Sequence, residues 1–531
     1  MFATDRLKHE CSTPSSRLVG VAVVLFATLL FAPSPAAAQR TKTRSAKYLL
    51  IVHQKRHREL QAELTTSLEK LAISCDAKGL SAAATQIRSL AAPIDAQQVR
   101  IDSLPKTVQP ELPANLPADE RYWRTQLQRL QAEYAKDVYL LSRRVLNAGL
   151  PSYAFFLIRE VAVRDPDHKS ARRLLGQVRF GKEWITPFAR SMLAKRYIWH
   201  EKFGWLPKNR VERYDKGERY FKGRWISATQ EAEVRRDFKN AWEIRTDHFL
   251  VRTNHSHEEG VAIAKKLEAY HGFFFQTFAS FFNTPEQMQK LFAGSTSGMR
   301  APIQAQPHVV HYYSNRDEYN RALVKTIPQI AITNGLYYTT DRTAYFYHDP
   351  NGENDPTLYH EASHQLFYES QSKERMVAGD DHFWIIEGIS CYLESFRPEK
   401  DRITVGDPKY IRFHAARHRF LVDKYYIPLG KLSAMSMRDF QSHPNISRNY
   451  SQASGLAHFF MNYDNGRYRD ALIEHLSQLY IGSKRRRAQT LAELTGSSYE
   501  ELDRQYGEHL RAMQTAIDKE RQQPQRQQPQ R

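Results

Sequence analysis

Residues 359–369 read Tyr-His-Glu-Ala-Ser-His-Gln-Leu-Phe-Tyr-Glu, and they set the interpretation of the C-terminal half of the chain. Asp355-Pro356 just before them is a good helix start, because aspartate caps a helix and proline fits its first position. His360 and His364 are then four residues apart on one helix, so their imidazoles project from one face. Both rings can reach one ion at about 2.0–2.1 Å. The stretch predicts a zinc-binding helix on which Glu361 is the general base.

A third ligand is required, because a catalytic zinc has three protein ligands and one position open to water. The candidate is Glu387, within the segment 384–394, Trp-Ile-Ile-Glu-Gly-Ile-Ser-Cys-Tyr-Leu-Glu. This segment is apolar and helix-like, and it carries a carboxylate in its middle. A buried carboxylate is costly without a cation or a hydrogen-bonding partner, and zinc on two histidines supplies the cation. The alternative is an arginine partner for Glu387.

The sequence around these residues predicts a mixed α+β domain. Residues 242–253 alternate like a strand, and 261–282 read as a long helix. A second strand is expected at 309–313, with a helix after it. Residues 335–347 are rich in tyrosine and threonine, as strands are. Several helices follow, up to about residue 515.

The order of these motifs resembles a known group of enzymes. His-Glu-x-x-His at 360–364, followed by a Trp-x-x-Glu-Gly helix at 384–388, is similar to the gluzincin zinc metallopeptidases, to which aminopeptidase N and thermolysin belong. The closer likeness, over about 243–515, is to peptidase-MA-like domains of secreted bacterial proteins, many of unknown function. The resemblance implies a thermolysin/aminopeptidase-like zincin domain of α+β class. It also implies that the strand at 335–338 lines the substrate cleft.

The resemblance further implies zinc-dependent hydrolysis of peptide bonds. Zinc lowers the pKa of its water to about 7 and so makes hydroxide available at neutral pH. Glu361 accepts the proton and later delivers it to the leaving amine. The segment 450–460 resembles the helix that opens with the oxyanion-steadying tyrosine of aminopeptidase-type gluzincins, so Tyr450 is the expected second stabiliser. An ordinary interfacial tyrosine is the alternative.

The chain also departs from the gluzincin pattern. Thermolysin-like enzymes place an aspartate four residues after the glutamate ligand to orient a histidine, and here Cys391 stands in that position. Glu394 is a candidate for the orienting role, and a solvated helix glutamate is the alternative. Nothing resembles the glycine-rich exopeptidase motif of aminopeptidase N. Endopeptidase action, or processing of a narrow set of partners, therefore stays open.

The first forty residues read as a secretory signal. Basic residues precede an apolar run at 18–31 that is too short to span a bilayer comfortably. Prolines follow, and Ala36-Ala37-Ala38 offers the small residues that a signal peptidase requires, so we expect a signal peptide at 1–38. The alternative is an uncleaved N-terminal anchor. No later stretch is apolar enough for a transmembrane segment, and we expect a soluble, exported chain, periplasmic or secreted.

Between the signal and the zinc motif the sequence predicts two further units. Residues 39–177 are expected to form a helical module, with prolines between 105 and 117 marking a linker. Within it, 151–175 weakly resembles a tetratricopeptide-type hairpin. Residues 178–240 are expected to form a small β-containing region.

That region carries a short pattern twice. At 179–186 and again at 221–227, a glycine turn precedes a Trp-Ile strand, which indicates two related β-elements. Their tryptophans either fill a small core, the favoured interpretation, or form a binding surface. At the other end of the chain, 516–531 is a low-complexity tail that we expect to be disordered.

Length, charge and cysteine content narrow the class of protein. A chain of 531 residues exceeds what one hydrophobic core usually supports, so two or more domains are expected. The formal charge is +19, and after export its partners would be anionic envelope polymers or lipid head groups, with no nucleic acid expected. Cys75 and Cys391 lie in different predicted units, which argues against a disulfide framework.

Two functions remain open from the sequence. The first is an exported zinc peptidase, acting on a peptide or protein substrate, whose helical module positions it or selects substrates. The alternative is a non-catalytic envelope binding or scaffold protein whose gluzincin-like domain keeps the metal for stability. Glu361 favours the first, because a purely structural site needs no base. A structural zinc also normally has four protein ligands, and only three are identified.

Overall fold

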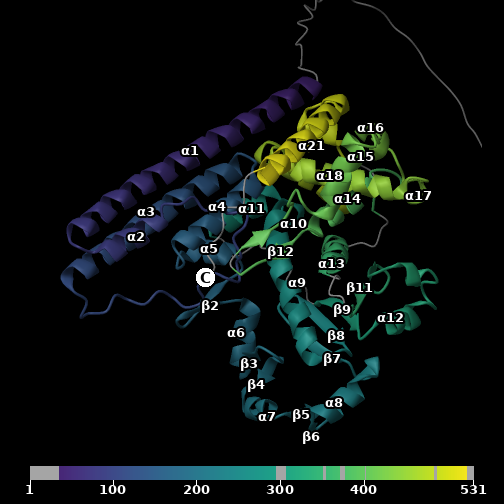
Figure 1. Ribbon diagram of the computed structural model, residues 1–531, viewed down its shortest axis with the longest axis horizontal. Helices are drawn as coiled ribbons and strands as arrows, with labels where there is room; N and C mark the ends of the chain where they lie inside the picture. Colours follow the sequence, from purple (N-terminus) through teal and green to yellow (C-terminus); the bar gives the residue numbers. More distant parts are fainter. Residues whose placement is uncertain are drawn as a thin grey trace, which may run out of the picture.

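The computed structural model describes residues 35–294, 306–350, 355–370, 377–400, 402–482 and 487–522, with side chains from residue 48 onward. Residues 1–34, which hold most of the predicted signal peptide, lie outside the described residues, as does the tail from 523. The described chain is mixed α+β, about 60% helical, with a small mixed sheet (Figure 1). Within the described ranges, no helix combines the length and the apolar character needed to cross a membrane.

The N-terminal part is a layer of packed helices, drawn purple to blue in Figure 1. They are α1 (Pro35–Ala77), α2 (Ser81–Ser89), α3 (Ala118–Asn147), α4 (Pro151–Arg164) and α5 (Lys169–Leu174). The leucines of α1 at helical spacing are buried against α3, and α4 packs along α3. The proline-rich stretch before α3 holds no helix, since proline lacks the N–H that a helix interior needs. We call residues 39–177 the helical module.

Three small hairpins follow, one more than the sequence pattern predicts. They are β1–β2 (Val178–Phe180, Glu183–Ile185), β3–β4 (Tyr197–His200, Gly204–Pro207) and β5–β6 (Glu218–Phe221, Arg224–Ser227). A short helix follows each hairpin: α6 (Pro187–Ala194), α7 (Val211–Asp215) and α8 (Ala228–Arg235). The middle copy escapes the pattern because Gly204 directly precedes Trp205, whereas residues separate glycine from tryptophan in the other two.

The tryptophans of the hairpins serve packing. Trp184 is buried, and its indole N–H donates to Asp167 at 2.7 Å. Trp225 packs edge-on against Tyr214, with ring centroids 6.1 Å apart. The favoured interpretation, in which these residues fill small cores, agrees with these contacts.

A five-stranded sheet of order β10-β11-β9-β8-β7 forms the base of the C-terminal region. Its strands are β7 (Trp242–Arg245), β8 (Phe249–Thr253), β9 (His308–Tyr313), β10 (Leu336–Tyr338) and β11 (Thr343–Tyr347). The three central strands are parallel, and the edge strands β7 and β10 run antiparallel to their neighbours. The single strand expected at 242–253 is a hairpin, closed by a 2.9 Å bond from the Thr246 N–H to the Phe249 carbonyl.

Helices surround this sheet and fill the rest of the chain. They are α9 (His257–Thr277), α10 (Ala279–Phe282), α11 (Pro285–Ala293), α12 (Arg316–Leu323), α13 (Asp355–Glu369), α14 (Phe383–Leu393), α15 (Ile411–Leu421), α16 (Leu429–Ser433), α17 (Met437–Gln441), α18 (Ile446–Gly466), α19 (Arg469–Ile481), α20 (Leu491–Thr495) and α21 (Tyr499–Gln522). A two-stranded ribbon, β12 (Arg397–Pro398) with β13 (Ile403–Thr404), follows α14. The last helix corrects one prediction, because α21 extends through residues 516–522 of the tail expected to be disordered.

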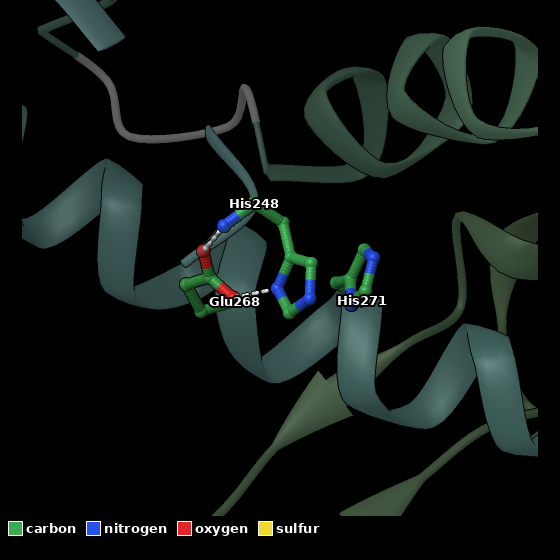
Figure 2. A group of neighbouring side chains, drawn as sticks. All are labelled: His248, Glu268 and His271. Carbon is green, nitrogen blue, oxygen red and sulfur yellow. Dashed lines mark hydrogen bonds and ion pairs between the residues drawn. The ribbon is translucent and has the colours of Figure 1, made fainter. Parts of the chain in front are cut away.

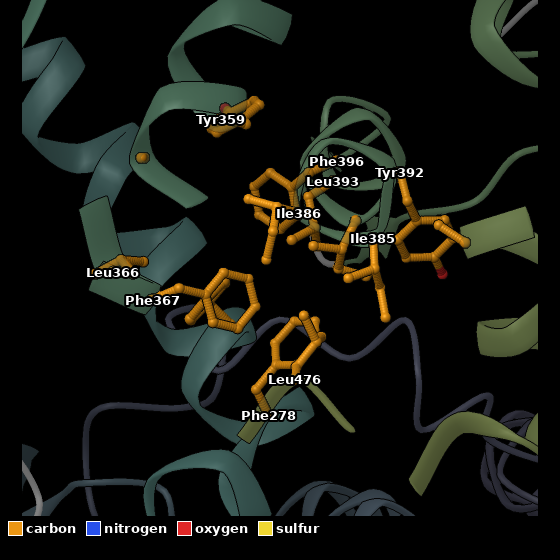
Figure 3. Packing of buried hydrophobic residues seen from close by; sticks show 14 of the residues in the cluster. Phe278, Tyr359, Leu366, Phe367, Ile385, Ile386, Tyr392, Leu393, Phe396 and Leu476 are labelled. Atoms are coloured by element: carbon orange, nitrogen blue, oxygen red, sulfur yellow. The ribbon is translucent and has the colours of Figure 1, made fainter. Parts of the chain in front are cut away.

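The core of this region gathers around α13 and α14. Figure 3 shows Leu366 and Phe367 of α13 near Ile385 and Ile386 of α14, with Phe278 beside them. Burial of each such side chain contributes about 1.5–3 kcal/mol, so these contacts fix the two helices relative to each other.

A glycine sets the distance between α14 and α18. A Cβ on Gly388 would lie 2.7 Å from the Ala453 carbonyl oxygen, so only glycine permits this approach. The three elements that carry the predicted site residues, α13, α14 and α18, are thereby held together.

Candidate metal centre

Two histidines and a carboxylate meet between α13 and α14. Nε2 of His360 lies 3.1 Å from Nε2 of His364, because residues four apart on a helix share one face. A carboxylate oxygen of Glu387, on α14, lies 3.5 Å from Nε2 of His360 and 3.9 Å from Nε2 of His364. The structure thus brings these three predicted ligands to one point.

Their spacing fits a tetrahedral metal. Donor atoms on a tetrahedral zinc, with bonds of about 2.0–2.1 Å, lie about 3.3 Å from one another. The three measured separations bracket this value. The rings of His360 and His364 are 4.8 Å apart at 70°, so both lone pairs can point toward a common centre. The three side chains are 13%, 19% and 12% exposed, which leaves a way in from solvent.

Burial and neighbouring charges act differently on the members of this group. Burial would lower the pKa of His360, but its hydrogen bonds with Cys391, Glu387 and Glu394 raise it well above the ordinary value. Burial would raise the pKa of the Glu387 carboxyl, but the hydrogen bond from His360 and the nearby His364 lower it below its ordinary value. Burial lowers the pKa of His364, which favours the neutral ring that a metal requires. Among the described residues, the partners of Glu387 are the two histidines and Tyr450, with no arginine.

Glu394 orients the first histidine. It is buried, and its carboxylate accepts a 2.8 Å hydrogen bond from Nδ1 of His360, which leaves Nε2 free to face the other donors. Arg412 of α15 donates to both of its oxygens, at 2.8 and 2.9 Å, and the Tyr410 hydroxyl donates at 3.0 Å. Burial would raise the pKa of Glu394, but His360 and Arg412 lower it to about 2. This carboxylate–histidine pair has the form that holds metal ligands in place.

Cys391 lies within the same group but is not the orienting residue. The thiol is buried and hydrogen-bonds with His360, and burial raises its pKa. The other ring nitrogen of His364, Nδ1, lies 3.5 Å from the Ser390 hydroxyl. The position at which thermolysin-like enzymes place an aspartate therefore holds a neutral thiol here, with the charged role taken one turn later by Glu394.

Glu361 lies on α13 between the ligands and the sheet. One of its oxygens accepts a 2.8 Å hydrogen bond from the backbone N–H of Tyr337, in the edge strand β10. The side chain is half-buried, and its charge lies close enough to His364 to raise the pKa of that ring in part against the effect of burial. A Cβ on Gly335 would lie 2.7 Å from Thr357 of α13, so the start of β10 is pressed against that helix. The base candidate and the edge strand are in direct contact.

Tyr450, at the start of α18, reaches the same point. Its hydroxyl is hydrogen-bonded with Glu387. Burial, and next the Glu387 charge, raise the pKa of the phenol, so the hydroxyl keeps its proton. The ring packs edge-on against Phe440 at 5.3 Å. All five predicted site residues therefore lie together.

Sequence reasoning missed two residues of this group, Tyr410 and Arg412. They come from the start of α15, and nothing near them in the sequence marks a site. The only available signal was indirect, since a buried Glu394 needs a cation or donors.

A cavity of about 570 Å³ lies elsewhere, between the helical module and α19. Leu150, Phe156 and Asp470 are among its lining residues, and none of the five predicted site residues lines it. It is separate from the candidate metal centre.

No protein-family model and no curated protein matches this chain. Any assignment of function therefore depends on the geometry described above.

Proposed function

We propose that the protein is an exported zinc-dependent peptidase. The observation that carries the proposal is the convergence of His360, His364 and Glu387 at separations of 3.1, 3.5 and 3.9 Å, with Glu361 beside them. Three ligands plus access to solvent is the composition of catalytic zinc sites, whereas structural sites close with four. The sequence resemblance to gluzincins points to the same chemistry.

We also propose that residues 241–515 form a thermolysin/aminopeptidase-like zincin domain. Its support is the arrangement of a histidine-bearing helix, α13, against a mixed sheet whose edge strand β10 contacts the base candidate. An extended peptide adding along β10 would pass in front of Glu361, because strands recognise extended chains through their free backbone edge.

Each residue then has one task in peptide hydrolysis. When bound, zinc supplies a Lewis acid at the scissile carbonyl and a nucleophile at neutral pH. Glu361 takes the proton from the attacking water and hands it to the leaving amine. The Tyr450 hydroxyl donates to the carbonyl oxygen as negative charge develops there. Glu394 holds the His360 ring in the tautomer that leaves Nε2 unprotonated.

Export and partners belong to the same proposal. A signal at 1–38 would send the chain to the periplasm or the exterior, where its substrate would be a peptide or protein. The basic surface implied by a formal charge of +19 would favour contact with anionic envelope polymers. The alternative function is a non-catalytic envelope scaffold that keeps zinc for stability.

The decisive experiment compares two variants of the purified chain. We expect Glu361→Gln to keep its zinc and lose hydrolysis of a peptide library, because the amide cannot take a proton. We expect His364→Ala to lose hydrolysis together with the zinc held by this site, because a ligand is gone. His414→Ala, at an exposed histidine of α15, is the matched control and should keep both properties. A chelator should abolish cleavage by the wild-type chain.

Three outcomes separate the two functions. Cleavage by Glu361→Gln at the wild-type rate would show that the assigned base is wrong. Zinc binding by the wild-type chain without cleavage of any library peptide would favour the scaffold. Loss of both properties in His414→Ala would show that folding, rather than the site, had been tested.

A further inference from the structure

A second group of side chains that could hold a metal lies at helix α9, which packs against strands β7 and β8. Glu268 and His271 are three residues apart on α9 and share one face of it, and His248 stands opposite them on the turn between β7 and β8 (Figure 2). One donor atom from each lies within 4.8 Å of the others. None of these residues belongs to the candidate metal centre.

Each member of the group has a feature that suits coordination. Both oxygens of Glu268 face His248, one at 2.7 Å from its Nδ1 and the other at 2.7 Å from its backbone N–H. His271 is 6% exposed, and its Nε2 has no hydrogen-bond partner among the described residues. A buried nitrogen without a partner is unfavourable, and an ion would satisfy it. His248 and Glu268 are 36% and 23% exposed, so the group is open to solvent.

We propose that His248, Glu268 and His271 form a second zinc site, independent of the one on α13 and α14. Two imidazoles and one carboxylate are ligands that zinc accepts, and solvent would complete the coordination. The site would tie the β7–β8 turn to α9. This proposal does not depend on the proposed peptidase activity.

The two sites differ in how closely their histidine rings already have the orientation that metal binding requires. The rings of His248 and His271 stack at 3.5 Å with 19° between their planes, whereas those of His360 and His364 are 4.8 Å apart at 70°. An imidazole lone pair lies in the ring plane, so two stacked rings cannot both point at one ion. His248 therefore has to turn out of the stack when zinc binds, and its place on an exposed turn permits this movement.

The two rings also differ in their electrostatic surroundings. Burial would lower the pKa of His248, but the hydrogen bond with Glu268 raises it. Burial lowers the pKa of His271 well below its ordinary value, which leaves that ring neutral and ready to coordinate. Because His248 has to leave the stack before both rings can face one ion, we expect the second site to bind zinc more weakly than the first.

The neighbouring residues do not complete a different site. His308 is 6.3 Å from His271 between ring centroids, and its Nδ1 is taken by Glu369 at 2.6 Å. Asp247 is close enough to Glu268 for their charges to repel, and an ion would relieve that repulsion.

The test is the zinc stoichiometry of the purified chain, measured by equilibrium dialysis against zinc at pH 8. We expect two equivalents for the wild-type chain. Glu268→Gln should bind one, because the amide keeps the size and one of the two acceptor oxygens that face His248 but loses the charge. His271→Ala and His364→Ala should each bind one, and the double variant Glu268→Gln/His364→Ala none. His414→Ala is the control and should bind two.

A second measurement guards against misfolding of the variants. Zinc should raise the melting temperature of His364→Ala, whose second site is intact, and should leave that of Glu268→Gln/His364→Ala unchanged. One equivalent in the wild-type chain, or a second equivalent that survives both Glu268→Gln and His271→Ala, would overturn the proposal. If His364→Ala instead keeps both equivalents, the peptidase site is wrong while the second site stands.

Discussion

Nδ1 of His360 donates a 2.8 Å hydrogen bond to Glu394, whose two oxygens also accept from Arg412. The pair links a proposed metal ligand on α13 to a helix that begins after residue 410. Because the carboxylate is buried and held from both sides, the orientation of the ring is decided by Glu394 and by the residues at the start of α15.

Glu394→Gln should therefore weaken zinc binding without removing a ligand. The amide is a poorer acceptor for the imidazole N–H, and loss of such a partner typically costs 10- to 100-fold in metal affinity. Competition with a chelator measures the effect. Glu508→Gln, on the exposed face of α21, is the control. Equal zinc affinity in Glu394→Gln and wild type would refute the orienting role.

Tyr450→Phe should reduce turnover while leaving the zinc content unchanged. Removing one donor to a developing oxyanion typically costs about 10²- to 10³-fold in kcat. Tyr425→Phe is a suitable control, because that hydroxyl donates to Asn449 at 2.6 Å. An unchanged kcat would restore the alternative of an ordinary interfacial tyrosine.

Gly388→Ala should push α18 away from α14. The added methyl would meet the Ala453 carbonyl oxygen at 2.7 Å, and overpacking of this kind costs about 1–3 kcal/mol. Urea unfolding measures the loss, and the zinc affinity should fall with it. Gly272→Ala, within α9, is the matched control: its nearest neighbour is 3.9 Å away, so we expect a gain of up to about 1 kcal/mol. Equal effects at the two glycines would contradict the close approach.

Removal of zinc should lower the stability of the whole C-terminal region. Zinc binds the folded site and not the unfolded chain, so its removal takes away the free energy of binding. Zinc at 100 times its dissociation constant contributes about 2.7 kcal/mol for each site. Calorimetry with and without chelator measures the shift. The variant Glu268→Gln/His364→Ala should melt at the same temperature in both conditions, and a shift there would mean that the zinc binds elsewhere.

The sequence anticipated the convergence of the histidines because it depends on local periodicity. His360 and His364 lie four positions apart on one helix, and Glu387 is a carboxylate in the middle of an apolar segment. The role of Glu394 stayed open, since it depends on Tyr410 and Arg412, whose approach is decided by tertiary packing.

Sequence patterns did not predict turns that lack glycine or proline at the expected positions. Residues 242–253, predicted as one strand, form a hairpin. The sequence did not show its turn, around Thr246, because that turn contains neither glycine nor proline. The third Trp hairpin was missed because the distance from glycine to tryptophan varies among the copies. The pairing of His248 with Glu268 and His271 joins a turn to a helix, and sequence spacing shows only its Glu-x-x-His half.

The packing of α11 has a consequence for how the protein matures. Met288, Leu291 and Phe292 are buried in the core of the helical module, where α11 packs against α3 and α5 and the Phe292 ring lies 5.3 Å from that of Phe155 in α4. A protease that removed the first helices would expose these three apolar side chains to water. The N-terminal helices are thus unsuited to be a prosegment shed on activation, and the two halves have to fold as one piece.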